Sequence, residues 1–511
     1  MILRELLARM TVAGVSGPLD AEVTGLALDS RRVRPGEVFF ALPGLKADGA
    51  RFAEAAIAAG AVAVVGPPGA RFTGATTIEA DEPRLALAQA ACAFHGDPSA
   101  GLEVVAVTGT NGKTTTTYML EAIFRAAGLR SGLIGTTGVH IDGELRPSAF
   151  TTPEAPELQA LLAEMKARGV EAVAMEVSSH ALVQRRTWGL QVDVAIFTNL
   201  TQDHLDYHGS MDAYLDAKLM LFDGRNGAPE LRKETFAVVN GDDPAAHAVS
   251  AAAGRGHMPA EGRFGEAAGN TLRIEILEML SGGMRLRFLD HVGVPADPPP
   301  SAGSAWHTGA RSTELVLPML GRFNAYNAAA AFAAADAWMG LETADIIRGL
   351  ETFAGVPGRL ERVDAGQPFT VVVDYAHTPD ALERALAACR EHAAGRVLCV
   401  FGCGGDRDRG KRPLMGAIAA RLANNAWVTN DNPRTEDPAA IAAEITAGAP
   451  AGGLVTILDR RAAIAAAIGE ARAGDIVLIA GKGHETTQTI GDMVTPFDDR
   501  IEARAALGVT R

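Results

Sequence analysis

The segment Thr108–Thr115, with the sequence TGTNGKTT, constrains the fold more than any other feature of this 511-residue chain. It follows the apolar run Val104–Val107 and precedes a stretch, 118–127, that we predict to be helical. Glycines let backbone N–H groups close around phosphate oxygens, and a helix N-terminus adds positive potential. The segment therefore predicts a strand, a phosphate-binding loop and a helix that together hold a nucleotide triphosphate.

Two side chains of this loop have the chemistry that ATP and Mg²⁺ require. Lys113 can reach the β- and γ-phosphates, and the Thr114 hydroxyl can ligate Mg²⁺. The general pattern G-x-x-x-x-G-K-[ST] would need a glycine at position 107, where this chain has Val107. A glycine-rich turn without a ligand is the alternative, which the strand–loop–helix context disfavours. The predicted ATP contacts of the loop are Gly109, Thr110, Asn111, Gly112, Lys113, Thr114 and Thr115.

The length of the chain and its apolar runs predict an α/β fold of three domains. Roughly 150 residues form one domain on average, so 511 residues are too many for a single core. Residues 1–100 alternate short apolar runs, at 38–42 and 61–65, with Ala-rich helices such as 52–60. This first block therefore reads as a small α/β domain.

The second block, 101–355, contains continuous apolar runs typical of strands buried on both faces of a parallel sheet. These runs lie at 104–107, 172–177, 192–197 and 237–239. Apolar and polar residues alternate over 271–290, which predicts antiparallel strands. A Pro-rich surface loop around 295–300 and a helix over 324–339 are expected to follow.

The third block, 356–511, repeats strands and helices in the order of a doubly wound, Rossmann-like domain. Its predicted strands are 369–373, 396–401, 426–429 and 476–480.

Composition excludes several classes of protein. A net charge of −14 argues against general binding of nucleic acid, which needs clustered Lys and Arg. No run approaches the roughly 20 uncharged apolar residues that span a bilayer, and the charged N-terminus is unlike a secretory signal. The four cysteines lack zinc or disulfide spacing and are expected to be free. We therefore expect a cytoplasmic protein without membrane insertion.

Polar side chains follow two of the predicted central strands. Glu176 comes at the end of one apolar run and His204 shortly after the next. Because ligands bind at the carboxyl ends of strands in open parallel sheets, both side chains could ligate a metal near the phosphates. A structural hydrogen-bonding role is the alternative for each. Lys218 lies in a predicted helix over 211–222, on one face with Tyr214 and Leu221, and by spacing alone would extend its charge to water.

With these residues assembled, the chain resembles the Mur ligases, and the resemblance covers essentially its whole length. So many motifs in one order are highly specific. They are TGTNGKTT (108–115), TTP (151–153), MEVSSH (175–180), TNLTQDHLDYHG (198–209), AYLDAKLMLF (213–222), GRFNAYNAAAA (321–331), GRLERV (358–363), DYAHTPDAL (374–382), GGDRDRGKRP (404–413), DNPRTEDP (431–438) and AGKGHE (480–485).

The resemblance implies an ATP-dependent, amide-forming activity. Mur ligases add amino acids to the cytoplasmic UDP-N-acetylmuramoyl precursor of peptidoglycan. Within the family, this chain is similar to the members that extend UDP-MurNAc-L-Ala-D-Glu, with meso-diaminopimelate as the added amino acid. The implied cofactors are two Mg²⁺ ions, with ATP as co-substrate, and the implied state is a monomer.

The resemblance also assigns residues, each at the position that matches a family motif. Lys113, Glu176, His204 and Lys218 become catalytic, with Lys218 carbamylated to N6-carboxylysine and ligating Mg²⁺ beside Thr114, Glu176 and His204. The N-terminal domain becomes the uridine-binding domain, the central domain the P-loop-type ATPase and the third domain the amino-acid-binding domain. The UDP-sugar dipeptide is expected to contact Leu28, Ser30, Leu45, Lys46, Ala47, Thr151, Thr152, Ser178, Gln184 and Arg186. The ATP site is completed by Asn327, Arg359, Asp374 and His377.

The third domain is expected to select the amino acid. An Arg434 guanidinium can read the far carboxylate of diaminopimelate with two parallel hydrogen bonds, and L-lysine would leave that arginine unpaired. A helix-capping turn is the alternative interpretation of the DNPR segment. The implied diaminopimelate contacts are Arg407, Asp431, Asn432, Pro433, Arg434, Gly481 and Glu485.

Three alternatives remain open from the sequence. A lysine-adding ligase would share every feature except the reader at Arg434. A folylpolyglutamate-type ligase would share the phosphate loop and the carbamylated lysine but lack the uridine domain and DNPR. A nucleotide-gated binding or scaffold protein would hold or hydrolyse ATP without forming an amide.

Overall fold

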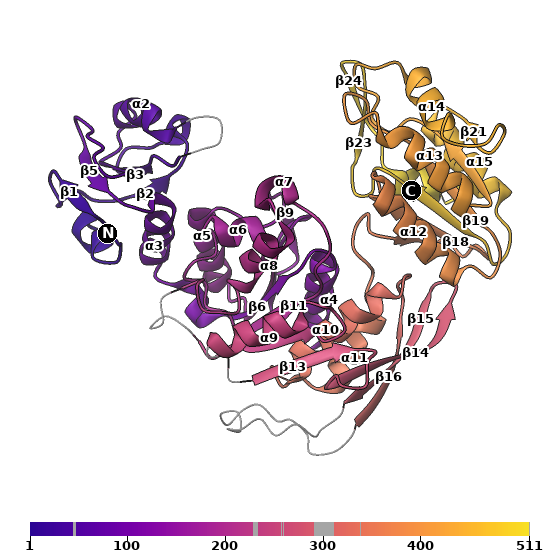
Figure 1. The fold of residues 1–511 in the computed structure, drawn as a ribbon, viewed down its shortest axis with the longest axis horizontal. Coiled ribbons are helices and arrows are strands. Elements are labelled where there is room, and N and C mark those ends of the chain that lie inside the picture. The colour runs from indigo at the N-terminus through magenta and orange to yellow at the C-terminus, as the bar shows by residue number, and fades with distance from the viewer. Residues whose placement is uncertain are drawn as a thin grey trace. The chain divides into compact units, whose positions relative to one another are not determined.

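The computed structural model describes residues 1–43, 48–227, 233–256, 258, 260–290, 311–337 and 339–509. The chain folds into two compact units, which are described here one after the other (Figure 1). One contains Met1–Leu272 and Ala330–Ile346, and the other contains Arg273–His291, Ala310–Ala329 and Ile347–Arg511. The α/β class with three domains is confirmed, because the described residues form three large sheets, of five, eleven and six strands, that pack against helices.

The N-terminal domain is a five-stranded sheet in the order β1-β5-β4-β3-β2. Strands β2 to β5 run parallel and β1 pairs antiparallel to β5. Helices α1 and α3 bury Leu3, Leu6 and Leu87 against one face, whereas α2 buries Ala53 and Ala56 against the other. The elements are α1 (Leu3–Leu7), β1 (Gly14–Ser16), β2 (Gly25–Ala27), β3 (Glu37–Phe40), α2 (Ala53–Ala58), β4 (Ala63–Gly66), β5 (Thr76–Glu79) and α3 (Pro83–His95).

The central domain is built on consecutive parallel strands in the order β13-β12-β11-β6-β10-β7, extended by the antiparallel strands β8 and β9. Its middle strands are fully buried, as continuous Val- and Ala-rich runs predict. The elements are β6 (Glu103–Thr108), α4 (Lys113–Ala126), β7 (Ser131–Gly135), β8 (Gly138–Ile141), β9 (Glu144–Arg146), α5 (Ala155–Ala167), β10 (Ala172–Glu176), α6 (Ser179–Val183), β11 (Val194–Phe197), α7 (Leu205–His208), α8 (Met211–Leu219), β12 (Phe236–Asn240), α9 (Ala246–Arg255) and β13 (Ala260–Gly265).

Helix α4 starts five residues earlier than predicted, at Lys113. The four threonines that follow are β-branched and have low helix propensity, which hid the first turn from local sequence reasoning. In the structure Thr115, Thr116 and Thr117 are buried, and the Thr117 hydroxyl donates to the carbonyl oxygen of Thr114 at 2.9 Å. Tertiary packing therefore overrides propensity here, and the helix N-terminus lies directly at the phosphate loop.

The second unit begins with antiparallel strands, as the alternation over 271–290 predicts. Strand β15 pairs with β16, with Met284 opposite Leu317. The predicted loop around 295–300 lies outside the described residues. The elements that follow β13 are β14 (Leu272–Leu280), β15 (Gly283–Asp290), β16 (Arg311–Leu317), α10 (Phe323–Ala337) and α11 (Thr343–Glu351). The part of α10 from Ala330 onward and the part of α11 up to Ile346 belong to the first unit.

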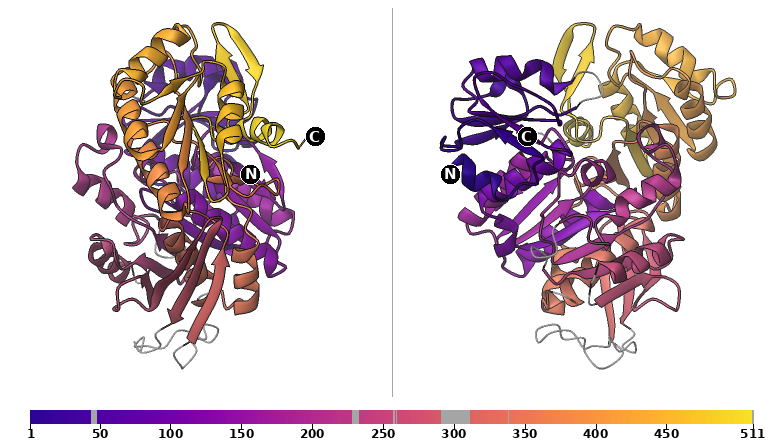
Figure 2. Two further views of the ribbon diagram at one scale, coloured as in Figure 1. Left: turned by 90° about the vertical axis from the view of Figure 1, so that its right-hand side faces the viewer. Right: turned by 60° about the vertical axis from the view of Figure 1, so that its left-hand side comes forward.

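The C-terminal domain is a six-stranded sheet in the order β17-β18-β22-β19-β20-β21, parallel except for β17. Helices α12, α13 and α14 cover one face and α15 and α16 the other, which confirms a doubly wound domain (Figure 2). The elements are β17 (Glu361–Val363), β18 (Thr370–Asp374), α12 (Pro379–His392), β19 (Val397–Phe401), α13 (Lys411–Leu422), β20 (Asn425–Val428), α14 (Pro438–Thr446), β21 (Val455–Thr456), α15 (Arg460–Glu470), β22 (Ile476–Ala480), β23 (Thr487–Ile490), β24 (Met493–Pro496) and α16 (Asp499–Ala506).

Two predictions from composition can be compared with the structure. All four cysteines are buried free thiols, as their spacing predicted. Over the parts of the chain that the structure describes, no helix has the length and apolar character needed to cross a membrane.

Candidate active site

The phosphate loop requires a glycine at its first bend. Gly109 has φ +149°, a conformation that other residues rarely adopt, and a Cβ atom there would lie 1.9 Å from Thr198 Oγ1. Val107, which stands where the general loop pattern has glycine, is instead a buried residue inside β6, opposite Glu176 and Ile196. The bend therefore begins two residues later than in the general pattern, which removes the need for glycine at 107.

Hydrogen bonds fix the loop to the segment that follows the neighbouring strand β11. The Thr110 amide donates to the Asn199 carbonyl at 2.8 Å, and the Asn111 amide donates to Asn199 Oδ1 at 3.0 Å. In return Thr198 Oγ1 donates to the Asn111 carbonyl at 2.6 Å. These bonds join segments that are far apart in the sequence, and they set the path of the loop before any ligand arrives.

Two lysines converge on the same loop. Lys113 Nζ donates to the carbonyl oxygens of Gly109 (3.0 Å) and Thr110 (2.8 Å), and Lys218 Nζ donates to that of Gly109 at 2.7 Å. Lys218 is 1% exposed and its Nζ lies 4.2 Å from the centroid of the Tyr214 ring. The expectation that Lys218 reaches water is therefore wrong.

The environment of Lys218 favours a neutral amine. Burial, followed by the nearby Lys113 ammonium, lowers the pKa of Lys218 well below its ordinary value, while Asp203 opposes the shift. A neutral amine is a nucleophile, whereas an ammonium is not. The side chain is thus chemically suited to covalent modification by an electrophile.

Glu176 lies at the end of β10 and is held by the turn between β7 and β8. Its Oε1 accepts a hydrogen bond from the Thr136 amide at 2.8 Å, and its Oε2 accepts one from the Thr136 hydroxyl at 3.2 Å. The Thr136 and Thr151 hydroxyl oxygens lie 2.9 Å apart. Glu176 is 1% exposed, so this turn fixes a buried carboxylate one strand away from the phosphate loop.

His204 has a backbone conformation that non-glycine residues seldom adopt. Its φ is +53°, it lies at the N-cap of α7, and about half of its side chain is exposed. Its ring makes an edge contact with that of His180, with centroids 4.8 Å apart, and its Nε2 lies 3.6 Å from an Asp203 oxygen. Strain of this kind is typical of positions that serve a ligand.

Four of the residues expected to bind the UDP-sugar dipeptide form one network. Thr152 Oγ1 donates to the Glu176 carbonyl at 2.8 Å and accepts from the Ser178 amide at 3.1 Å. Arg186 donates to the Thr152 carbonyl (3.0 Å) and to Gln184 Oε1 (2.6 Å). The fifth, Thr151, joins through its contact with Thr136. The network thus connects the predicted dipeptide residues to the predicted metal carboxylate.

We expect Thr152→Val to lower the stability of the protein, because it leaves the Ser178 amide without its acceptor. Valine has the same shape as threonine, and Thr152 is 1% exposed. The expected loss in the free energy of unfolding is therefore about 1–3 kcal/mol. Thermal unfolding followed by circular dichroism measures it. Thr151→Val is the matched control, since Thr151 is partly exposed and should change little. Equal unfolding temperatures for the two variants would contradict the assigned role of Thr152.

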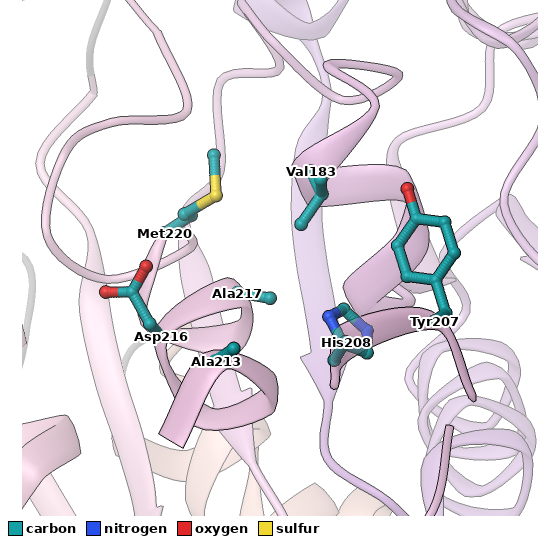
Figure 3. Close-up of a pocket in the computed structure, with 7 residues that line it drawn as sticks. All are labelled: Val183, Tyr207, His208, Ala213, Asp216, Ala217 and Met220. Carbon is teal, nitrogen blue, oxygen red and sulfur yellow. The ribbon is translucent and has the colours of Figure 1, made fainter. Parts of the chain in front are cut away.

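A pocket of about 400 Å³ lies on the side of α8 that Lys218 does not occupy. Figure 3 shows Tyr207 and His208 of α7 opposite Ala213, Asp216 and Ala217 of α8. None of the predicted nucleotide-binding residues lines it. Tyr207 nevertheless accepts a hydrogen bond from Gln184 at 3.2 Å, so the pocket adjoins the dipeptide network.

The predicted uridine contacts lie in the N-terminal domain. Leu28 and Ser30 directly follow β2 and are both half-buried, Ser30 at the start of a short 3-10 turn. Leu45, Lys46 and Ala47 fall outside the described residues. Leu28 and Ser30 thus lie at the carboxyl end of a parallel strand, where ligands of α/β sheets bind.

In the second unit, three of the predicted ATP contacts lie around the carboxyl end of β18. Both Asp374 oxygens accept backbone hydrogen bonds, from Leu360 at 2.7 Å and Ala376 at 2.8 Å, and burial raises the pKa of this carboxyl. His377 Nδ1 lies 2.8 Å from the Tyr375 carbonyl oxygen. Arg359 lies over the Tyr375 ring, with 5.7 Å to its centroid. Asn327 is on α10, where its amide donates to Asn324 at 2.9 Å.

The predicted diaminopimelate contacts surround the carboxyl ends of β20 and β22. Asn432 Nδ2 donates to Glu485 Oε2 at 2.9 Å, and Arg434 Nη1 donates to the Gly405 carbonyl at 2.7 Å. Gly481 directly follows β22 and has φ +122°. A Cβ atom added there would lie 3.7 Å from Asp431 Cγ, so the glycine leaves the space beside Asp431 open. Pro433 is buried between Asn432 and Arg434, and Arg407 is exposed on the neighbouring loop.

Arg434 is held in an unusual conformation by the hairpin β23–β24. Its φ is +52°, its amide donates to the Thr489 carbonyl at 3.1 Å, and its carbonyl accepts from the Gly491 amide at 2.7 Å. The DNPR segment does not cap the following helix: the side chain of Asp437 caps α14. The backbone conformation of Arg434 therefore orients its side chain and has no part in capping a helix.

Sequence reasoning missed four contacts of these clusters. Thr136, Thr198, Asn199 and Lys482 each hold a predicted site residue in place. Thr198, Asn199 and Lys482 belong to motifs that carry the family resemblance, TNLTQDHLDYHG and AGKGHE. Thr136 lies outside every motif, and only the hairpin β7–β8 brings it to Glu176.

The chain combines a parallel-sheet domain, which carries a hydrogen-bonded phosphate loop and a buried carboxylate, with a doubly wound domain. This combination defines an ATP-binding ligase, and the chain belongs to the Mur ligase family. The Mur ligase middle domain matches residues 107–335. The Mur ligase glutamate ligase domain matches 358–483, and the Mur ligase family catalytic domain matches 22–95.

The particular relatives share one name. The UDP-N-acetylmuramoyl-L-alanyl-D-glutamate–2,6-diaminopimelate ligase of Geobacillus thermodenitrificans is 46% identical over 511 residues, covering 99% of each chain. The ligase of the same name from Syntrophomonas wolfei is 43% identical, with the same coverage. A solved structure of a ligase so named is similar with a TM-score of 0.74, at 33% identity and 99% coverage of both chains.

Proposed function

We propose that this enzyme uses ATP to join 2,6-diaminopimelate, as its meso isomer, to the D-Glu γ-carboxylate of UDP-MurNAc-L-Ala-D-Glu. The product is the tripeptide precursor of peptidoglycan. The full-length similarity to ligases named for this reaction supports the proposal. The observation that carries it most directly in the structure is Lys218, a buried lysine with a depressed pKa against the phosphate loop.

The proposed reaction has two steps. An oxygen of the γ-carboxylate attacks the γ-phosphorus of ATP, the bond to the β-phosphate oxygen breaks, and an acyl phosphate and ADP form. The neutral amine of diaminopimelate then attacks the acyl carbon and loses its proton, and the tetrahedral intermediate expels phosphate to leave the amide. A carboxylate is a poor electrophile, and phosphorylation supplies its leaving group.

The phosphate loop and Lys113 have defined tasks in the first step. The amides of the loop and the N-terminus of α4 hold the triphosphate, and the Lys113 ammonium offsets the repulsion between two anions. In the present contacts that ammonium binds loop carbonyls, so it must turn toward the phosphates when ATP enters. Asn327, Arg359, Asp374 and His377 are proposed to complete ATP binding.

Lys218 is proposed to act as a carbamate, N6-carboxylysine. Its neutral amine nitrogen attacks CO₂, a C–N bond forms while a C–O π bond opens, and one proton leaves the nitrogen to solvent. The group becomes an anion with two oxygen donors in place of an amine. Burial, which favours the neutral amine, supports this step.

Most of the proposed donors are oxygens, the ligands that Mg²⁺ prefers, and His204 would add one nitrogen. Thr114, Glu176, His204 and the carbamate of Lys218 are proposed to hold them, and Glu176 is already fixed through both carboxylate oxygens. Bound Mg²⁺ would neutralise charge on the triphosphate and the carboxylate. Among the described residues, no group of three or more His, Cys, Asp or Glu side chains is placed so that it could hold a metal ion by itself.

Diaminopimelate is preferred over L-lysine because its far end carries a carboxylate as well as an ammonium. The Arg434 guanidinium is proposed to bind the carboxylate, and Glu485 and Asp431 the ammonium. A lysine substrate would leave a partly buried arginine without its anion. A folylpolyglutamate-type activity is less well supported, because the Escherichia coli FolC structure shares 23% identity with this chain and supports the fold alone.

An assay of ADP release with UDP-MurNAc-L-Ala-D-Glu and single amino acids tests the proposal. We expect ADP and tripeptide in equal amounts with meso-diaminopimelate, and about 10⁴-fold lower kcat/KM with L-lysine, as for substrates that leave a buried polar group unpaired. Mass spectrometry of the product provides the second readout.

Each alternative predicts a different result in this assay. Activity with L-lysine at or above that with diaminopimelate would refute the substrate, and ADP release without amide would favour a nucleotide-gated binding protein. Omitting the UDP-sugar dipeptide is the control for uncoupled hydrolysis. The proposal also includes a cytoplasmic monomer, and light scattering on the purified protein tests the monomeric state.

A further inference from the structure

Lys482 is a buried cation that has no role in the proposed reaction as described above. It follows Gly481 at the end of β22, and its side chain is 0% exposed. Its Nζ donates to Asn432 Oδ1 and to Glu485 Oε2, both at 3.2 Å. Burying an ammonium is costly unless anions and hydrogen bonds compensate it. Here the compensating groups are two residues of the proposed diaminopimelate site.

A second carboxylate lies beside the same ammonium. Asp431 Oδ1 is 3.9 Å from Lys482 Nζ, and Asp431 is 8% exposed. That oxygen has no hydrogen-bond partner within the described residues. A buried carboxylate oxygen without a donor is unusual in a folded protein and indicates a donor that arrives with a ligand.

The two carboxylates of this cluster, Asp431 and Glu485, outnumber the cation that they share by one. Arg460 also lies near Asp431, but it forms a fully buried ion pair with Asp499 at 2.7 Å, so its charge is already matched. Asp431 and Glu485 therefore share one further cation, Lys482. Two carboxylates and one ammonium carry a net charge of −1.

We propose that Lys482 is a positioning residue that orients Asn432 and Glu485 and leaves the cluster of Asp431, Glu485 and Lys482 one negative charge, which matches a single substrate ammonium. The inference rests on the proposed function, since the far end of diaminopimelate carries one ammonium and one carboxylate. The carboxylate has the Arg434 guanidinium, and the ammonium has the free acceptor of Asp431 and the carboxylate of Glu485. Lys482 thereby sets the charge of this cluster without touching the reacting atoms.

Removing the Lys482 charge should also change how the site responds to pH. Burial raises the pKa of Asp431, while Arg460 and Lys482 oppose this and Glu485 and Asp499 add to it. Without Lys482 the pair of carboxylates would retain a proton at higher pH. A raised pKa means that the anionic form, which binds the ammonium, is lost as the pH falls through that pKa.

The test compares three variants of the full-length enzyme. For Lys482→Met we expect the KM for diaminopimelate to rise about 10- to 100-fold, the loss expected for a charged hydrogen-bonded group, with the KM values for ATP and the UDP-dipeptide unchanged. Its kcat/KM for diaminopimelate should fall toward lower pH more steeply than that of the wild type. Lys482→Arg keeps the charge, so the steeper pH dependence should disappear, while the wider guanidinium displaces Asn432 and still raises the KM.

Arg396→Met is the matched control. Arg396 pairs with Glu470 and Asp475 in the same domain, but it directly precedes β19 and therefore lies at the opposite end of the strands from Lys482. This variant should lower the unfolding temperature without changing the KM for diaminopimelate.

An unchanged KM for diaminopimelate in a folded Lys482→Met protein would overturn the inference, and so would a parallel loss for all three substrates. If Lys482→Met does not fold, an unchanged KM in Lys482→Arg overturns it instead. Failure of the wild-type enzyme to use diaminopimelate is a separate result, seen before any variant is compared, and would overturn the proposed function itself.

Discussion

The Lys218→Ala protein should form its amide product on the order of 10³-fold more slowly than the wild type, and short carboxylic acids such as acetate should restore part of the rate. The proposed carbamate of Lys218 supplies anionic oxygen donors beside the phosphate loop. Alanine removes them and leaves a buried space next to Tyr214 and Gly109, which a small carboxylate can enter. ADP release and product mass, measured with and without acetate, test both parts.

Lys218→Met is the matched control for this experiment. Methionine fills most of the volume of the lysine side chain but cannot react with CO₂, so the variant should be equally slow and should not respond to acetate. Full activity of either variant would rule out a carbamate at this position. A loss without rescue in the alanine variant would assign Lys218 to holding the Gly109 carbonyl instead.

Gly109→Ala should weaken ATP binding by about 100-fold or more, because overpacking and backbone strain each cost about 1–3 kcal/mol. The new Cβ atom would lie 1.9 Å from Thr198 Oγ1 and 3.1 Å from the backbone nitrogen and oxygen of Asn199, at a φ of +149°. Both costs act on the bend that aims the loop amides at phosphate. Isothermal titration calorimetry with ATP measures the loss directly.

Comparison with Gly128→Ala distinguishes the effect of backbone strain from that of steric overlap. Gly128 follows α4, the helix that begins at the phosphate loop, and also has a positive φ of +80°, but a Cβ atom added there would meet no other atom within 4 Å. This variant should lower stability by about 1 kcal/mol and leave ATP binding intact. Wild-type affinity in Gly109→Ala would show that the loop can move away from Thr198 and is not fixed by the segment after β11.

The fold was predictable from sequence wherever the information is local. The continuous apolar run Val104–Val107 predicts a buried strand, and the alternation over 271–290 predicts antiparallel strands. The start of α4 was not predictable, because its threonines disfavour a helix and only burial stabilises them. The hairpin β23–β24 was also missed, since its residues are largely exposed and form no apolar pattern.

The candidate site was predictable as a set of residue types, but not as a set of contacts. Glu176 was identified by its place after a strand, yet its partner Thr136 lies 40 residues away and reaches it only through the turn after β7. Lys218 showed the same limit: spacing placed it beside Tyr214, but helical spacing cannot tell a buried lysine from one at the surface. Burial depends on what packs against the helix, which no single segment of sequence contains.

The hydrogen bonds between the β23–β24 hairpin and the backbone of Arg434 limit how the amino-acid specificity of the enzyme can be changed. Because Thr489 and Gly491 bind the backbone of Arg434 on both sides, the direction of its side chain is set by a segment that is distant in the sequence. A new side chain at 434 would inherit that direction whether or not it suits the new substrate. Redesign or natural divergence of substrate choice would therefore have to exchange the DNPR loop and the hairpin as one module.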